Sequence, residues 1–128
     1  MNIRALQRGL QYRGRVDAVR QSYHVFEGKQ LFLVLSFARS RARRGSGYFN
    51  LVGRAAVDYV QGRFGGKRGV TANDVTVGAR RTSHVPTRLL ALNVLYVLTA
   101  LKGATIDRAG EHRQLFFSVR KRRESGRA

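Results

Sequence analysis

The first part of the chain distributes its apolar residues in the manner of β-strands. Residues 23–26 and residues 31–37 are two such segments, and the second is almost wholly apolar and rich in β-forming side chains. Gly28 lies between them, where a hairpin turn is expected. Residues 48–52 resume the same pattern. The spacing therefore predicts a three-stranded antiparallel sheet.

The two ends of the chain contain few apolar residues. Residues 1–14 mix polar, apolar and basic positions, and this pattern fits either a short helix or a basic arm. Residues 120–128 are polar and charged without an apolar anchor, so we expect a mobile tail.

The apolar spacing changes from that of strands to that of helices after residue 53. Apolar side chains then recur at three- and four-residue intervals, which predicts a helix ended by Gly65-Gly66. Thr71 is followed three positions later by Asp74, the pattern of a helix N-cap with a capping box. A short second helix is expected from there to residues 78–79.

A third and longer helix is predicted before residue 103. Ser83 is placed to cap this helix, and Pro86 would fall in its first turn, where the missing N–H has no cost. The helix is apolar over most of its circumference, so it must be buried on several sides. Residues 104–106 and 113–119 then predict a β-hairpin.

Composition agrees with one compact unit. The chain has 128 residues and 43% hydrophobic content, which is enough to form a core without metals or crosslinks. We expect an α+β fold in which residues 1–53 form a basic arm and a β-meander, residues 54–119 a helical lobe, and residues 120–128 a basic tail.

The charge of the chain points to an anionic partner. Lys and Arg number 25 against 7 Asp and Glu, a formal net charge of +18, and the excess is spread over both halves. Solubility alone requires far less charge than this. Most of the cations are arginines, whose planar fork suits phosphates and guanine edges. This composition favours a nucleic-acid partner.

Several other classes of protein are not expected. No apolar segment is long enough to span a bilayer, and the N-terminus lacks the apolar core of a signal peptide, so a cytoplasmic or nucleoid location without membrane contact is expected. The absence of cysteine excludes disulfides and Cys-based zinc sites. His84 and His112 have no neighbour at a spacing that suggests nucleophilic catalysis. We expect neither a cofactor nor a catalytic site.

The order of the predicted elements after residue 53 resembles the winged helix-turn-helix family. A helix, a short helix, a tight turn, a long helix and a β-hairpin follow one another over residues 54–119, roughly half of the chain. The resemblance implies a winged helix-turn-helix over these residues. Together with the strand pattern before residue 53, we expect an α+β protein in which an N-terminal three-stranded antiparallel sheet packs with a C-terminal winged helix-turn-helix. It also implies binding to double-stranded DNA.

In this family the third helix enters the major groove through its N-terminal part, and the wing touches the backbone or the minor groove. The resemblance therefore nominates for the groove Ser83, His84, Thr87, Arg88 and Ala91. Arg80 and Arg81 would lie beside phosphates. The wing would present Arg108, Glu111, His112 and Arg113.

Two further basic segments are candidates for phosphate contacts. The first carries Arg39, Arg41, Arg43 and Arg44 and precedes Tyr48 and Phe49, a combination that suits phosphates or the stacking of exposed bases. The second contains Lys121, Arg122 and Arg123, which add affinity without sequence preference.

The preferred interpretation is a duplex-DNA-binding regulator or architectural factor, and two alternatives stay open. An RNA-binding or ribosome-associated protein would have the same composition. A Mg²⁺-dependent nuclease of restriction type would use Asp17 and Glu27 with Lys29 near a scissile phosphate. Glu-Gly-Lys is, however, also ordinary turn chemistry.

Overall fold

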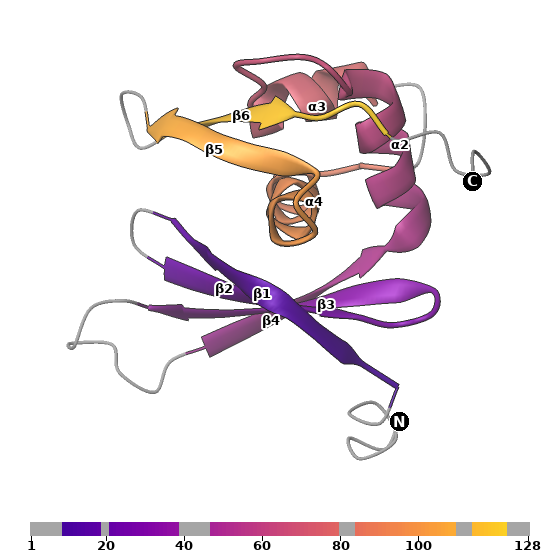
Figure 1. Cartoon of the computed structure of the whole chain (residues 1–128), viewed down its shortest axis with the longest axis vertical. Helices are drawn as coiled ribbons and strands as arrows, with labels where there is room; N and C mark the ends of the chain where they lie inside the picture. Colours follow the sequence, from indigo (N-terminus) through magenta and orange to yellow (C-terminus); the bar gives the residue numbers. More distant parts are fainter. Residues whose placement is uncertain (1–8, 19–20, 39–46, 80–83, 110–113, 123–128) are drawn as a thin grey trace.

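The fold is described from a computed structural model, which covers residues 9–18, 21–38, 47–79, 84–109 and 114–122 (Figure 1). The first four strands form one antiparallel sheet in the order β1-β2-β3-β4. Their bounds are Gln11–Asp17, Gln21–Glu27, Leu31–Ala38 and Gly47–Gly53. The expected α+β class is confirmed.

The sheet has four strands, so the prediction of three was wrong. The additional strand is β1, which begins inside residues 1–14, the segment for which a short helix or a basic arm was expected, and continues to Asp17. Val16 is the one side chain of β1 that is buried, so the strand has almost no apolar alternation. Gly14 has a positive φ of 146°, and the pairing with β2 shifts register between Tyr12 and Gly14. β1 is an edge strand because its backbone pairs with β2. Its side-chain pattern alone does not indicate a strand.

The hairpin predicted around Gly28 is confirmed. Strands β2 and β3 pair from Gln21↔Ala38 to Glu27↔Phe32, and the Gly28 N–H donates to the Leu31 carbonyl across the turn at 2.8 Å.

Three helices follow the sheet: α2 (Arg54–Phe64), α3 (Ala72–Gly78) and α4 (Arg88–Ala100). The capping box of α3 is confirmed, because the Asp74 N–H donates to Thr71 Oγ1 and the Thr71 N–H donates to the Asp74 carboxylate. Helix α2 ends at the expected glycines. A Cβ at Gly65 would lie 2.7 Å from the Gln61 carbonyl oxygen and 3.2 Å from Lys121 Cα, so this position also allows the chain after β6 to approach closely.

Helix α4 begins later than predicted. Its N-cap is Thr87, whose hydroxyl accepts from the Leu90 N–H at 3.1 Å. Pro86 therefore precedes the cap and does not lie in the first turn. Proline disfavours helical geometry in the residue before it, which is Val85 here. Ser83, the expected cap, lies outside the described residues.

Strands β5 (Ala104–Ala109) and β6 (Leu115–Val119) form the predicted C-terminal hairpin. The first strand is longer than expected, because pairing with β6 continues past Ile106. The chain after β6 is also held in place. The Arg120 N–H donates to the Gly103 carbonyl at 2.9 Å, and Arg122 pairs with Asp58 at 2.5 Å. Residues 120–122 therefore do not belong to a free tail.

Helix α4 lies at the centre of the molecule. It packs on one face of the four-stranded sheet, and α2, α3 and the β5-β6 hairpin lie on its other side (Figure 1). Eight of its residues are buried, as its apolar circumference predicted. None of the described helices is both long and apolar enough to cross a membrane.

Candidate nucleic-acid interface

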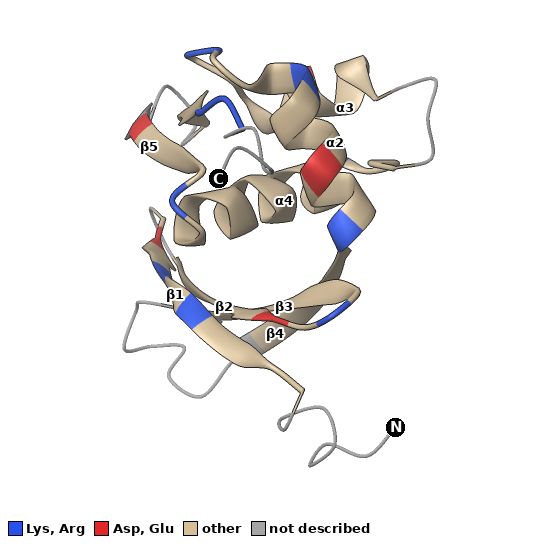
Figure 2. Ribbon diagram, turned by 45° about the vertical axis from the view of Figure 1, so that its right-hand side comes forward, with Lys and Arg blue, Asp and Glu red and all other residues tan. Residues whose placement is uncertain are grey.

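One face of the four-stranded sheet is turned away from α4 and carries apolar and aromatic side chains. The sheet curves around α4, which covers only the opposite face (Figure 2). Strand alternation and register assign the uncovered positions. We call this surface the outer face; its residues are Tyr12, His24, Phe26, Leu33, Leu35, Phe37, Phe49 and Leu51.

Four rings of the outer face contact one another across three strands. Tyr12 lies 5.1 Å from Phe26 and 6.0 Å from His24, and His24 lies 5.7 Å from Phe37 in an edge-on arrangement, measured between ring centroids. The Tyr12 hydroxyl and His24 Nδ1 are 3.1 Å apart. These contacts hold the rings as a continuous row.

Four of the eight outer-face side chains are exposed, and the other four are partly buried. Phe49 is 66% exposed, and Tyr12, Leu51 and Phe37 are each exposed by more than 40%. Large apolar patches of this kind on monomeric proteins usually mark binding sites. Exposed aromatic side chains on a sheet provide platforms on which unpaired bases stack.

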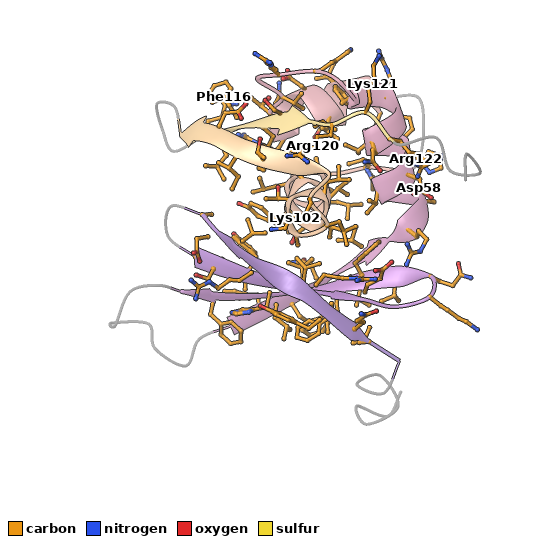
Figure 3. All side chains as sticks on the ribbon, viewed as in Figure 1. Asp58, Lys102, Phe116, Arg120, Lys121 and Arg122 are labelled. Carbon is orange, nitrogen blue, oxygen red and sulfur yellow. The ribbon has the colours of Figure 1, made fainter. Side chains whose placement is uncertain are left out.

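A second surface collects cations around the end of α2. We call Arg63, Lys67, Arg68 and Lys121 the cation cluster. Arg63 and Lys67 both lie over the ring of Phe64, at 5.8 and 5.4 Å from its centroid, and the side chain of Lys121 runs along Gly66. Basic positions lie on the α2-α3 connection and after β6 (Figures 2 and 3).

A hollow of about 540 Å³ opens among these cations, and Arg63, Lys67 and Arg68 contribute to its wall. Asp74 also lines the hollow, but its carboxylate accepts the Thr71 N–H as part of the helix cap. Within the described part of the chain, no member of the cation cluster forms a salt bridge. Three cations and one carboxylate line the hollow, so its wall has a net positive charge.

Glu27 and Asp17 are paired with other side chains at the sheet. Glu27 pairs with Arg13 at 2.5 Å and with Arg54 at 2.7 Å. Burial alone would raise the pKa of Glu27, but hydrogen bonds and positive charge from Arg54 and Arg13 hold this pKa below its ordinary value. Asp17 lies near Arg15 and accepts from the Ser22 hydroxyl.

The two carboxylates considered for a nuclease are not brought together. Asp17 is opposite Ser22 at one end of the β1-β2 ladder, whereas Glu27 is at the other end. Five residues of strand separate Ser22 from Glu27, a distance of about 17 Å. Among the residues that the structure describes, no group of three or more His, Asp and Glu side chains is arranged as metal ligands.

Helix α4 offers little surface to a DNA groove. Ala91 is fully buried, although the family resemblance nominated it for groove contact. Thr87 uses its hydroxyl as the N-cap, and Arg88 is exposed in the first turn. His84 is exposed and stacks on Tyr59 with centroids 5.3 Å apart. Eight of the thirteen residues of α4 are buried, and its exposed residues are Arg88 and Leu89 in the first turn.

The other predicted site residues are distributed as follows. Lys121 and Arg122 are exposed after β6, and Arg122 faces Asp58 (Figure 3). Arg108 belongs to β5. Outside the described residues lie Arg39, Arg41, Arg43, Arg44, Arg80, Arg81, Glu111, His112, Arg113 and Arg123.

Sequence reasoning missed the exposed Tyr12 and Phe37 and the partly buried Phe26 as candidate site residues, and it missed the cation cluster. Strand alternation was visible in the sequence, but it does not say which face another element will cover. Lys67 and Lys121 are far apart in the sequence, so only the fold could join them.

Comparison of the chain with protein-family models, with curated proteins and with solved structures found no match.

Proposed function

We propose that this protein binds nucleic acid, with phosphates on the cation cluster and unpaired bases on the outer face. The net charge of +18 supports an anionic partner. The aromatic row supports a partner that has flat, stackable groups. A nucleic acid supplies both kinds of group, and because the cation cluster and the outer face lie on opposite sides of α4 (Figure 1), only a strand long enough to pass around the molecule reaches both.

The observation that carries this proposal is the cation cluster. Arg63 and Lys67 lie over Phe64, Arg68 lines the same hollow and Lys121 runs along Gly66, and none of them forms a salt bridge among the described residues. This concentration of like charge is unfavourable unless an anion compensates it. Phosphate groups are the matching anions, and each neutralised phosphate releases counterions.

We place base contact on the sheet because α4 is enclosed. A duplex-reading role for α4 would depend on its first turn, where Arg88 is the one cation. Single-stranded DNA or RNA needs no groove-penetrating helix, and it can present its bases to the outer face. A preference for duplex DNA would instead favour the winged-helix interpretation.

The test compares labelled single-stranded DNA, single-stranded RNA and duplex DNA of equal length by fluorescence anisotropy over a range of salt concentrations. We expect the single strands to bind more tightly than the duplex. The logarithm of the association constant should fall linearly with the logarithm of salt, with a slope of about −3 or steeper. Affinity that does not depend on salt would overturn the proposal.

A second candidate function follows from the apolar character of the outer face. Two copies of the chain could associate face to face and bury Phe37, Phe49 and Leu51, because packed sheets commonly meet in this way. Light scattering across a concentration series distinguishes the two functions. Under the nucleic-acid proposal the free protein is monomeric, and a stable dimer that Leu51→Lys dissociates would favour association.

A further inference from the structure

A groove separates the start of β4 from the first turns of α4. Its volume is about 350 Å³, within the range of small-molecule sites. The wall contains the aromatic and apolar residues Tyr23, Tyr48, Phe49, Leu89 and Leu92, together with three side-chain amides, Gln21, Asn50 and Asn93. Apolar and aromatic side chains with a small number of polar groups are the usual lining of a ligand pocket.

Asn93 is the unusual member of this wall. The residue is 1% exposed, and its Nδ2 donates to the Leu89 carbonyl at 2.9 Å. Its Oδ1 is buried and accepts no hydrogen bond from the described part of the chain. Leaving a buried acceptor unsatisfied costs stability, and most buried polar atoms in proteins have a partner.

The missing partner must be a hydrogen-bond donor. The bond from Nδ2 to Leu89 fixes the orientation of the amide, and the remaining oxygen can only accept. A ligand that satisfies Asn93 must therefore bring an N–H or O–H group into an apolar, aromatic groove.

We propose that the groove holds one nucleobase, with an exocyclic amino group of the base donating to Asn93 Oδ1 and its ring against Tyr48 or Phe49. This site rests on the proposed nucleic-acid binding and gives it selectivity for bases that carry an amino group. Phe49 belongs to both the groove and the outer face, so a strand on the outer face can continue into the groove. Tyr48 and Phe49 are each 66% exposed and available for stacking.

Oδ1 is shielded from solvent, so a side chain of the wall must turn aside before a base reaches it. Leu89 is 60% exposed, and Tyr48 is similarly open. Neither side chain is held by packing over most of its surface, and their movement requires no change in the backbone.

The test uses the full chain and three thymidine oligonucleotides that differ at one central position. That position carries adenine, unsubstituted purine, which lacks the amino group, or an abasic site. We expect adenine to bind about tenfold more tightly than purine, because purine leaves the buried acceptor unpaired. This comparison is made in the wild-type protein and does not depend on the folding of a variant.

Asn93→Leu should abolish the preference for adenine and leave the salt slope unchanged. Thr99→Val is the matched control, since it removes an equivalent α4 bond, from Thr99 Oγ1 to the Leu95 carbonyl, away from the groove. The control should keep the preference. Equal, salt-dependent binding of all three oligonucleotides overturns the base site and leaves the proposed function standing. Failure to bind any of them overturns both.

Discussion

The ring of Tyr23 stacks on the ring of Tyr96, with centroids 4.0 Å apart and planes inclined by 26°. Tyr96 also meets Phe117 of β6 edge-on at 6.2 Å. One side chain of α4 therefore contacts both the four-stranded sheet and the C-terminal hairpin. This contact fixes the position of the sheet over α4, and with it the orientation of the outer face.

Tyr96→Ala should lower the free energy of unfolding by about 3–5 kcal/mol, because it leaves a cavity where three elements meet. Leu92 is only half-buried, so Leu92→Ala should cost less. Urea unfolding followed by circular dichroism measures both values. If Tyr96→Ala were as stable as the wild type, the described packing of Tyr96 between the sheet and the C-terminal hairpin would be contradicted.

Stability should also fall at alkaline pH. Burial, together with the charge and the hydrogen bond of Tyr23, raises the pKa of Tyr96 above its ordinary value of 10.0. The folded state therefore resists ionisation, and the free energy of unfolding should fall as the pH rises above that ordinary value. Tyr96→Phe should reduce this fall when unfolding is compared at about pH 8 and pH 11. Tyr12→Phe, at a half-exposed ring, should not.

Glu27→Gln tests the ion pairs that Glu27 of β2 forms with Arg13 and Arg54. The pKa of Glu27 is below its ordinary value of 4.5, so its contribution is present above that pH and is lost as the pH falls through the folded-state pKa. We expect a loss of about 1 kcal/mol at neutral pH, since both arginines are more than a third exposed and water screens the pairs. The variant should show a weaker pH dependence below about pH 4.5 than the wild type. An unchanged acid profile would contradict the prediction.

Phe37→Leu should weaken the binding of single-stranded oligonucleotides by about 1–3 kcal/mol, because a base loses the ring on which it stacks. Phe37→Tyr keeps an aromatic ring and serves as the control. Fluorescence anisotropy at fixed salt gives both affinities. If the Phe37→Leu and Phe37→Tyr variants bind the oligonucleotide with equal affinity, stacking at this position is not part of the interaction.

Lys67→Ala and Arg68→Ala should each make the salt slope shallower by about one unit, because each removes one phosphate contact. Lys29→Ala removes an exposed cation from the β2-β3 turn and provides the matched control. It should leave the slope unchanged. If Lys29→Ala changed the salt slope as much as Lys67→Ala does, the slope would depend on the net charge of the protein and not on the cation cluster.

The sequence by itself determined the local features. Thr71 and Asp74 are three residues apart and form reciprocal hydrogen bonds at the start of α3. Their spacing in the sequence was therefore sufficient to predict where this helix begins. The hairpin at Gly28 and the apolar circumference of α4 were also visible, because each depends on residues that are near in the chain. The excess of cations is a property of composition.

Only the tertiary structure decided which surfaces are exposed. β1 became a strand through pairing with β2, and packing around α4 buried eight of its residues, among them Ala91, which the family resemblance assigned to DNA. Contacts between distant segments brought Lys121 into the same surface as Lys67. Such contacts also placed Asn93 in a groove, where its Oδ1 is a buried acceptor. Apolar periodicity shows that a face will be buried, but the partner that buries it is fixed by packing across the whole chain.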